Sequence, residues 1–303
     1  MSLTFEQALT QALEKLEKMS ESPQLDAELL LAHVTKKTRE YILSHPEKVL
    51  LGKQKISFDK FIIRRTQLEP IAYITKHKEF YGLDFEVTQN TLIPRPETEH
   101  LVEISLKEIS TIKKFATLLV LDIGTGSGNI IISLARNIKN KIKNKIKFFG
   151  IDISEKTLDV AKQNARKNKV ANKIKFIKSN LLNYFLRDKN NLLKIKNTKL
   201  IIVSNLPYLS QEIYSQTLPN VKKFEPASAL LSGRHGLDHY KKLLDQIERL
   251  KEKYPALRLT CYMEFSPEQR TRLQKIIKGY FPESQVEFQK DLRNKWRVAS
   301  FSI

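Results

Sequence analysis

Short apolar runs alternate with amphipathic stretches from residue 117 to the end of the chain. Runs such as 118–121 and 200–203 are apolar at every position, which is typical of parallel strands that are covered on both faces. We expect strands at 117–123, 147–153, 174–178, 199–204, 257–264, 284–290 and 296–302, interspersed with helices at 129–138, 155–168, 236–252 and 266–279. This order predicts an α/β fold with a doubly wound, mostly parallel seven-stranded sheet and a ligand site at the carboxyl ends of its strands.

The N-terminal region follows a helical pattern instead. Apolar residues of 4–19 recur on one helical face, and further helices are expected at 26–34, 38–43 and 57–65. Thr38 and Ser57 stand where N-caps are needed. The pattern predicts a small helical bundle.

A turn signal separates the two regions. Gly82 lies between 79–81 and 83–87, whose apolar and polar residues alternate as in a β-hairpin. We therefore expect a helical domain at 1–78, a hairpin connector at 79–90 and an α/β domain at 91–303. Pro96 then suits the first turn of a helix that continues to Ile109, with acidic residues near its positive end.

Glycines follow the first strand of the α/β region at alternate positions, Gly124, Gly126 and Gly128. A strand, a Gly-rich turn and a helix together bring backbone N–H groups and a helix N-terminus up to a ligand. The dinucleotide-binding fingerprint requires glycine at position 129, where this chain has Asn. The spacing resembles the cofactor loop of class I S-adenosylmethionine methyltransferases, although a glycine turn alone could simply allow a strand and a helix to pack closely.

Polar residues also end the next two strands. Asp152 ends the second strand, where a carboxylate can accept hydrogen bonds from both ribose hydroxyls of a nucleoside. Asn180 and Leu181 follow the third strand, where an adenine ring is expected. Asp152 lies 28 positions after Gly124, rather than the roughly 20 of nicotinamide-binding folds, which disfavours an oxidoreductase.

The fourth strand leads into Asn205-Leu206-Pro207-Tyr208. An amide or ring-attached amino group is a poor nucleophile because its lone pair is delocalised, so its methylation requires an oriented NH2 group. The Asn205 side-chain carbonyl and the Leu206 backbone carbonyl can accept its two N–H groups, while Pro207 restricts the backbone and Tyr208 offers an aromatic wall. Alone, this tetrapeptide would be a tight turn; after the glycine loop and Asp152, we interpret it as the active site, with no metal required.

Charge is unevenly distributed along the chain, whose net charge is +20. Residues 1–90 contain 13 basic and 13 acidic residues, whereas residues 137–200 contain 18 basic and 4 acidic ones. This basic region could attract RNA or a ribosome, or it could be a solvated surface. The densest tract, 137–147, has no aromatic residue or arginine, which favours the solvated surface.

Other features narrow the class of protein. A single cysteine, Cys261, excludes an internal disulfide and a cysteine-based zinc site, and we expect it to be a buried thiol. The N-terminus lacks the apolar core of a signal peptide, and no apolar run approaches a membrane span. We expect a cytoplasmic monomer.

Several longer motifs resemble those of the HemK/PrmC family, whose members methylate the glutamine amide in the Gly-Gly-Gln motif of class-1 peptide-chain release factors. The resemblance extends from about residue 24 to the C-terminus. Besides the glycine loop, Asp152 and Asn205-x-Pro-Tyr, it includes segments 26–34, 69–74, 79–87, 93–99, 224–230, 290–292 and 297–298. The most specific are Glu-Phe-Tyr-Gly and Pro-Arg-Pro-Glu-Thr-Glu, at 79–82 and 94–99.

The resemblance implies a role for each matching position. S-adenosylmethionine, which leaves as S-adenosylhomocysteine, would be bound by Gly124, Thr125, Gly126, Ser127, Gly128, Asp152, Asn180, Leu181 and Asn205. The glutamine amide would be held by Asn205, Leu206, Pro207 and Tyr208. The resemblance also implies a class I methyltransferase fold and a helical domain that recruits the release factor.

Three departures keep alternatives open. Leu206 replaces the family's usual proline, Asn180 stands where aspartate is common, and 232–237 replaces a turn richer in glycine and aspartate. Asn-Leu-Pro-Tyr also occurs in rRNA adenine dimethyltransferases, so a methyltransferase of nucleic-acid amino groups is the second hypothesis. The third is a non-catalytic RNA- or ribosome-binding protein that retains the fold.

The basic tract separates these hypotheses. We predict that replacing the lysines of 139–147 with glutamine barely changes methyl transfer at moderate salt, because a solvated tract makes no contact with substrate. The measurement is methyl-transfer rate against salt concentration. A large loss of rate that depends on salt would instead support the nucleic-acid hypothesis.

Overall fold

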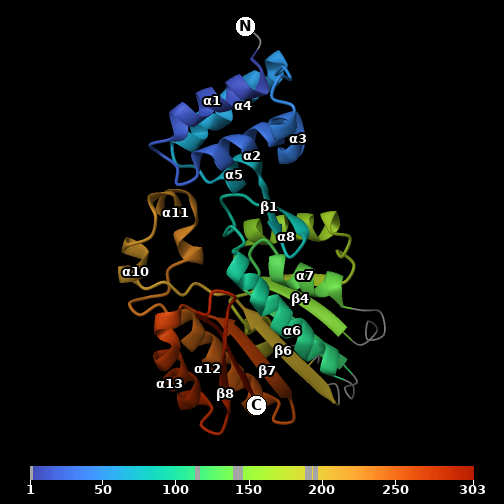
Figure 1. The fold of residues 1–303 in the computed structure, drawn as a ribbon. Helices are drawn as coiled ribbons and strands as arrows, with labels where there is room; N and C mark the ends of the chain where they lie inside the picture. The colour runs from blue at the N-terminus through green and yellow to red at the C-terminus, as the bar shows by residue number, and fades with distance from the viewer. Residues whose placement is uncertain (1–2, 113–116, 139–145, 188–192, 194–196) are drawn as a thin grey trace. The chain divides into compact units, whose positions relative to one another are not determined.

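The computed structural model describes residues 3–112, 117–138, 146–187, 193 and 197–303 (Figure 1). The chain forms two compact units. The first contains Met1–His77 and Leu218–Phe224, and the second contains Lys78–Thr217 and Glu225–Ile303. The pattern placed 218–224 within the α/β region, so its membership of the helical unit was not foreseen.

The first unit is a bundle of helices. They are α1 (Phe5–Leu16), α2 (Pro23–Thr35), α3 (Arg39–Ser44), α4 (Gly52–Thr66), α5 (Ile71–Thr75) and the short α11 (Pro219–Phe224). Phe5, Leu31 and Phe58 of three different helices are buried in one apolar cluster. Thr38 caps α3 as predicted, because its hydroxyl accepts a hydrogen bond from the Tyr41 N–H.

The predicted cap at Ser57 is wrong. Helix α4 begins at Gly52, so Ser57 lies inside it. The first turn is stabilised by Gln54, whose side-chain oxygen accepts the Leu51 N–H at 3.1 Å. A glutamine that reaches back to the preceding backbone satisfies one of the donors that a helix start leaves free, and Ser57 is not needed for it.

Two buried acids of α2 are paired within the first unit. Asp26 accepts hydrogen bonds from Arg65 Nε at 2.6 Å and from Ser20 Oγ at 2.5 Å. Glu28, which is 1% exposed, accepts one from Arg39 Nε at 2.5 Å. A buried carboxylate is tolerated only when it is paired, so these bonds tie α2 to α4 and to the start of α3.

The second unit is built on a seven-stranded sheet of order β5-β4-β3-β6-β7-β9-β8. The strands are β3 (Thr117–Ile123), β4 (Ile146–Asp152), β5 (Ile174–Lys178), β6 (Thr198–Ser204), β7 (Arg258–Glu264), β8 (Val286–Lys290) and β9 (Trp296–Ser302). The first five in this order pair in parallel, and β9 is antiparallel to both of its neighbours. The predicted α/β fold with a mostly parallel seven-stranded sheet is confirmed.

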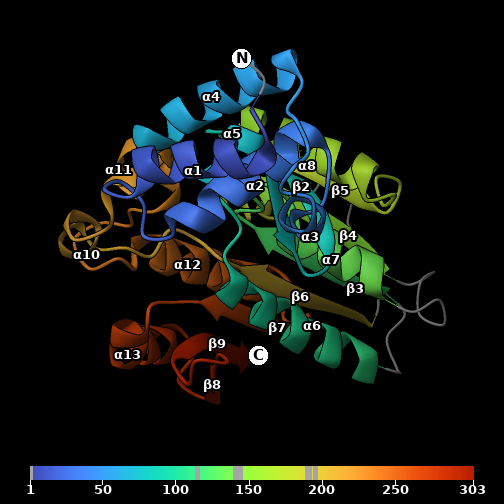
Figure 2. The same ribbon diagram turned by 45° about the horizontal axis from the view of Figure 1, so that its top comes forward.

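Helices cover both faces of this sheet (Figures 1 and 2). They are α6 (Glu99–Thr111), α7 (Asn129–Asn137), α8 (Glu155–Lys167), α9 (Asn183–Leu186), α12 (Asp238–Lys253) and α13 (Arg270–Tyr280), while α10 (Gln211–Ser215) follows the loop after β6. On β3, Leu119 and Leu121 face one apolar cluster, and Leu118 and Val120 face the other. This two-sided burial explains why the strands are apolar at every position.

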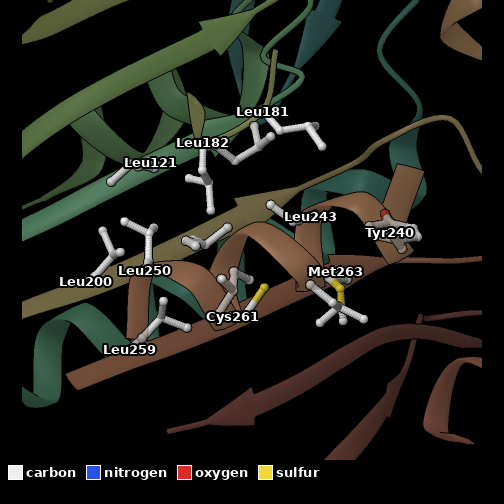
Figure 3. Packing of buried hydrophobic residues seen from close by; sticks show 14 of the residues in the cluster. Leu121, Leu181, Leu182, Leu200, Tyr240, Leu243, Leu250, Leu259, Cys261 and Met263 are labelled. Atoms are coloured by element: carbon white, nitrogen blue, oxygen red, sulfur yellow. The ribbon is translucent and has the colours of Figure 1, made fainter. Parts of the chain in front are cut away.

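Figure 3 shows the cluster on the side of α12. Leu243 and Leu250 of α12 pack here with Leu200 of β6 and Met263 of β7. Cys261 is fully buried among them, as expected for a thiol with a packing role. In the described part of the chain, no helix is long and apolar enough to cross a membrane.

The predicted hairpin is present as β1 (His77–Phe80) and β2 (Leu83–Glu86). Its two turn residues, Tyr81 and Gly82, have φ of 53° and 66°. A two-residue hairpin turn with both central residues in this left-handed region matches the twist of the strands. Tyr81 adopts it although it has a side chain, and Glu99 accepts the Tyr81 N–H at 2.9 Å.

Asn164 of α8 joins the hairpin to the glycine loop. Its Oδ1 accepts the Glu86 N–H at 2.7 Å, and its Nδ2 donates to Glu86 O and Ser127 O, both at 2.9 Å. The side chain is fully buried. One amide therefore satisfies backbone groups of both the connector and the glycine loop.

Replacing Asn164 with Ala is predicted to lower the free energy of unfolding by about 2–4 kcal/mol, because it removes the hydrogen-bond partner of the buried Ser127 carbonyl and of two partly buried backbone groups of Glu86. Asn168→Ala is the matched control, since Asn168 is partly exposed and donates to Asp84 O and Asn164 O. Chemical denaturation of each variant gives the comparison. Equal losses for the two variants would contradict the role of Asn164.

Candidate active site

The glycine loop connects β3 to α7 through left-handed backbone. Gly124, Gly126 and Gly128 have φ of 74°, 54° and 82°. A Cβ on Gly124 would lie 2.8 Å from Leu206 Cδ2, and one on Gly128 would lie 2.8 Å from Ile132 Cδ1. Two of the three glycines are therefore required by close packing as well as by backbone conformation.

Asp122 stabilises this loop through a side-chain hydrogen bond. It is fully buried at the end of β3, and its Oδ2 accepts a hydrogen bond from Thr125 Oγ1 at 2.6 Å. Burial raises the pKa of its carboxyl to about 7, against the opposing effect of the Thr125 hydrogen bond. Asp122 was not among the residues predicted for the site, although the hydroxyl of Thr125, three residues later, was a visible sign of this contact.

Asp152 connects the ends of β4 and the glycine loop. Its Oδ2 accepts the Gly126 N–H at 3.1 Å and its Oδ1 accepts the Ser154 N–H at 2.9 Å. Burial raises its carboxyl pKa, while these backbone hydrogen bonds lower it. A carboxylate has about four acceptor positions, so Asp152 can still accept a hydrogen bond from a hydroxyl group of a ligand.

These residues surround a cavity of about 330 Å³ in the second unit. Ten of the predicted site residues line it: Gly124, Thr125, Gly126, Ser127, Asp152, Asn180, Leu181, Asn205, Leu206 and Pro207. Gly128 and Tyr208 lie outside its lining. The volume falls in the range of small-molecule sites, roughly 300–1,000 Å³.

Leu181 shows how the third strand contributes. It has a φ of 50°, which is unusual for a residue with a side chain. The next residue, Leu182, donates its N–H to Gln246 Oε1 of α12 at 2.6 Å, so α12 holds this turn. Strained backbone at a cavity wall is often associated with function.

Asn205 and Leu206 are held by different neighbours. Asn205 Nδ2 donates to Thr98 Oγ1 at 3.0 Å, and the Leu206 N–H donates to the Tyr240 hydroxyl at 3.3 Å. The buried Leu206 side chain fills the space beside Gly124, so the departure from proline is accommodated by packing. The four-residue segment therefore has defined partners on both sides.

Tyr208 points its hydroxyl into the protein. The hydroxyl donates to Glu264 Oε1 at 3.2 Å, and the Tyr208 carbonyl accepts a hydrogen bond from Gln269 Nε2 at 2.7 Å. Burial, and then the nearby Glu264 carboxyl, raise the pKa of Tyr208. Tyr208 is therefore a neutral donor at physiological pH.

Part of the cavity wall was not predicted from the sequence. Residues of 89–98 and 226–229 also line it, together with His239. Arg95 and the buried Glu225 join the two segments, with 2.5 Å between Arg95 Nη2 and Glu225 Oε1. Both segments contain motifs that carried the family resemblance, and that was the available signal.

The described part of the basic region forms several ion pairs. Lys162 lies 2.9 Å from Asp159, Lys178 lies 3.0 Å from Glu155, and Lys167 pairs with Asp84. Four lysines of the densest tract, in 139–145, lie outside the described residues. The described pairs are consistent with a solvated, partly neutralised surface.

Comparison with known proteins assigns both parts of the chain. Residues 7–75 match the model of the PrmC N-terminal domain, and residues 114–276 match that of a methyltransferase domain. The catalytic domain of hMettl16 with the MAT2A 3'UTR hairpin 1 is 15% identical, covers 89% of this chain and 90% of its own, and has a TM-score of 0.52. At this identity the likeness concerns the fold alone.

Closer relatives share most of their length with this chain. The release factor glutamine methyltransferase of Koribacter versatilis is 37% identical over 82% of this chain and 83% of the relative. That of Bacillus anthracis is 32% identical over 91% of each. The resemblance drawn from the motifs is confirmed: the chain is a methyltransferase and belongs to the release factor glutamine methyltransferase family.

Proposed function

We propose that this protein transfers a methyl group from S-adenosylmethionine to the side-chain amide of the glutamine in the Gly-Gly-Gln motif of class-1 release factors. One observation supports this most strongly. Asn205, held by Thr98, lines the same cavity as the glycine loop and Asp152. A group that can orient an amide is thus next to a site suited to a nucleoside.

The residues present fit the cofactor. A side chain at Gly124 would collide with Leu206, so this part of the loop carries no side chain, and the Asp152 carboxylate can still accept a hydrogen bond from a ribose hydroxyl. Asn180 and Leu181 would flank the adenine. When bound, the cofactor supplies a methyl group made electrophilic by its sulfonium.

The remaining task of the protein is to hold the amide. Asn205 Oδ1 would accept one N–H of the glutamine and the Leu206 carbonyl the other, which favours a nitrogen whose lone pair is no longer delocalised. Pro207 limits the backbone freedom of Leu206. Well-oriented reactants can reach effective molarities of roughly 10⁵–10⁸ M, so positioning accounts for most of the catalysis.

The two units would divide the work. We assign 1–78 to recruitment of the release factor, 79–90 to the connector and 91–303 to methyl transfer. An enzyme that modifies release factors acts in translation termination, so we place this protein in the cytoplasm. We also expect it to act as a monomer.

Methylation of a nucleic-acid amino group is the second candidate. It is favoured by Leu206 in the tetrapeptide and by the 18 basic residues of 137–200. Labelled methyl transfer to a purified release factor, to its Gly-Gly-Ala variant and to ribosomal RNA separates the two. Label on the native factor alone supports the proposal, and label on RNA contradicts it.

Asn205→Ala is predicted to reduce kcat by about 10²–10³-fold, the size of effect seen when one transition-state hydrogen bond is removed. The affinity for S-adenosylmethionine, measured by calorimetry, should change by less than about threefold because other residues hold the cofactor. A variant that keeps most of its activity would remove Asn205 from the reaction.

Asp152→Ala is predicted to weaken S-adenosylmethionine binding by about 10–100-fold, because hydrogen bonds to a charged group contribute roughly 1.5–3 kcal/mol. Asp159→Ala is the control, since Asp159 is exposed and paired with Lys162 on the following helix. Calorimetric dissociation constants for both variants test this. Equal affinities would place the ribose elsewhere.

A further inference from the structure

A buried carboxyl lies behind the tetrapeptide and outside the cavity. Glu264, at the end of β7, is 1% exposed. Its Oε1 accepts the Tyr208 hydroxyl at 3.2 Å, and the Tyr240 hydroxyl donates to its backbone oxygen. Its Oε2 is buried and has no well-formed hydrogen bond with the residues that the structure describes. The proposed reaction gives this carboxyl no role so far.

Thr98 stands between this carboxyl and the cavity. It is 1% exposed, and its side chain lowers the pKa of Glu264 as a hydrogen-bond partner. On its other side, Thr98 Oγ1 accepts from Asn205 Nδ2 at 3.0 Å. Thr98 thus neighbours the Glu264 carboxyl and is hydrogen-bonded to Asn205, which lines the cavity, and we refer to these three residues as a line from the protein interior to the cavity.

The chemistry of these three groups determines the direction of the line. An ionised carboxylate only accepts hydrogen bonds, and a hydroxyl has a single proton to donate. If Thr98 gives its proton to Glu264, it offers only lone pairs to Asn205. Asn205 must then turn its NH2 group to Thr98, which leaves its carbonyl oxygen for the cavity.

We propose that Glu264 and Thr98 are positioning residues: the Glu264 carboxylate orients the Thr98 hydroxyl, and Thr98 holds the Asn205 amide with its carbonyl oxygen toward the substrate. This inference rests on the proposed function, in which that oxygen accepts an N–H of the glutamine. A reversed Asn205 amide would place its own N–H groups against those of the substrate, and both sets of donors would be left unsatisfied.

The surroundings of Glu264 make its charge sensitive to pH. Burial raises the pKa of its carboxyl to about 7, whereas Thr98, Arg297 and Tyr208 lower it and Glu97 raises it. Arg297 shares its charge with Asp291, whose Oδ2 lies 3.0 Å from Arg297 Nε. The Tyr240 hydroxyl, on α12, stays neutral because burial and Glu264 raise its pKa.

Protonation would undo the orientation. A protonated Glu264 can itself donate to Thr98, which frees the Thr98 proton for Asn205 Oδ1 and allows the amide to turn. The active form is therefore the ionised one. The rate of methyl transfer should rise with pH through about 7.

Thr98→Val tests the line by removing the hydroxyl while keeping the shape. We expect kcat at pH 8 to fall about 10–100-fold, with the S-adenosylmethionine dissociation constant unchanged within about twofold. Thr98→Ser, which retains the hydroxyl, should stay within about threefold of the wild-type kcat. Equal losses for Val and Ser, or no loss for Val, would overturn the proposal.

The pH profile tests the carboxyl. In Glu264→Gln, kcat should no longer rise with pH near 7, because an amide does not titrate there. Asp122→Asn is the control, because Asp122 has a similar carboxyl pKa but its hydrogen bond is to Thr125. The kcat of Asp122→Asn should still rise with pH near 7. A rise of kcat near pH 7 that persists in Glu264→Gln would overturn the role of the carboxyl.

A readout without substrate separates this inference from the proposed function. NMR spectra of asparagine-labelled enzyme, with the Asn205 side-chain signals assigned by their loss in Asn205→Ala, should show NH2 protons that shift with pH through about 7. This shift should vanish in Thr98→Val and Glu264→Gln. If the wild-type enzyme methylates no release factor, the proposed function fails. The NMR result by itself then supports or overturns the proposed positioning of Asn205 by Thr98 and Glu264.

Discussion

The parallel register of three neighbouring strands is the constraint on which the site depends. Ile123 pairs with Ile151 on one side and with Ser204 on the other, so β3, β4 and β6 end at the same level. The glycine loop, Asp152 and Asn205 follow these ends and are therefore brought to the same edge of the sheet, where Asp152 also accepts the Gly126 N–H. Close packing of Leu206 against Gly124 then sets the distance between the glycine loop and the tetrapeptide.

Much of this arrangement could be predicted from sequence because it follows from local patterns. Apolar runs gave the strands, since both sheet faces are covered, and polar residues at strand ends marked the site. The hairpin was predictable from Gly82, whose neighbour Tyr81 shares its left-handed backbone. The start of α4 was not predicted correctly, because the side chain of Gln54 makes the capping hydrogen bond that the Ser57 hydroxyl was expected to make.

Other features depend on contacts between residues far apart in sequence, which no local pattern reveals. Thr98 looked like part of a well-formed helix start, yet its hydroxyl holds Asn205, 107 positions away. Glu264 ends an ordinary apolar strand, and only its burial beside Tyr208 and Thr98 distinguishes it. The segment 218–224 follows the tetrapeptide in sequence but folds with the helical unit. Such pairings are decided by tertiary packing.

The most direct test of the account is a crystal structure of the enzyme with S-adenosylhomocysteine and a Gly-Gly-Gln release factor. The account predicts that the glutamine amide nitrogen lies within hydrogen-bond distance of Asn205 Oδ1 and the Leu206 carbonyl, while Asn205 Nδ2 still contacts Thr98. A glutamine held by other residues, or an Asn205 that has left Thr98 in the complex, would contradict it.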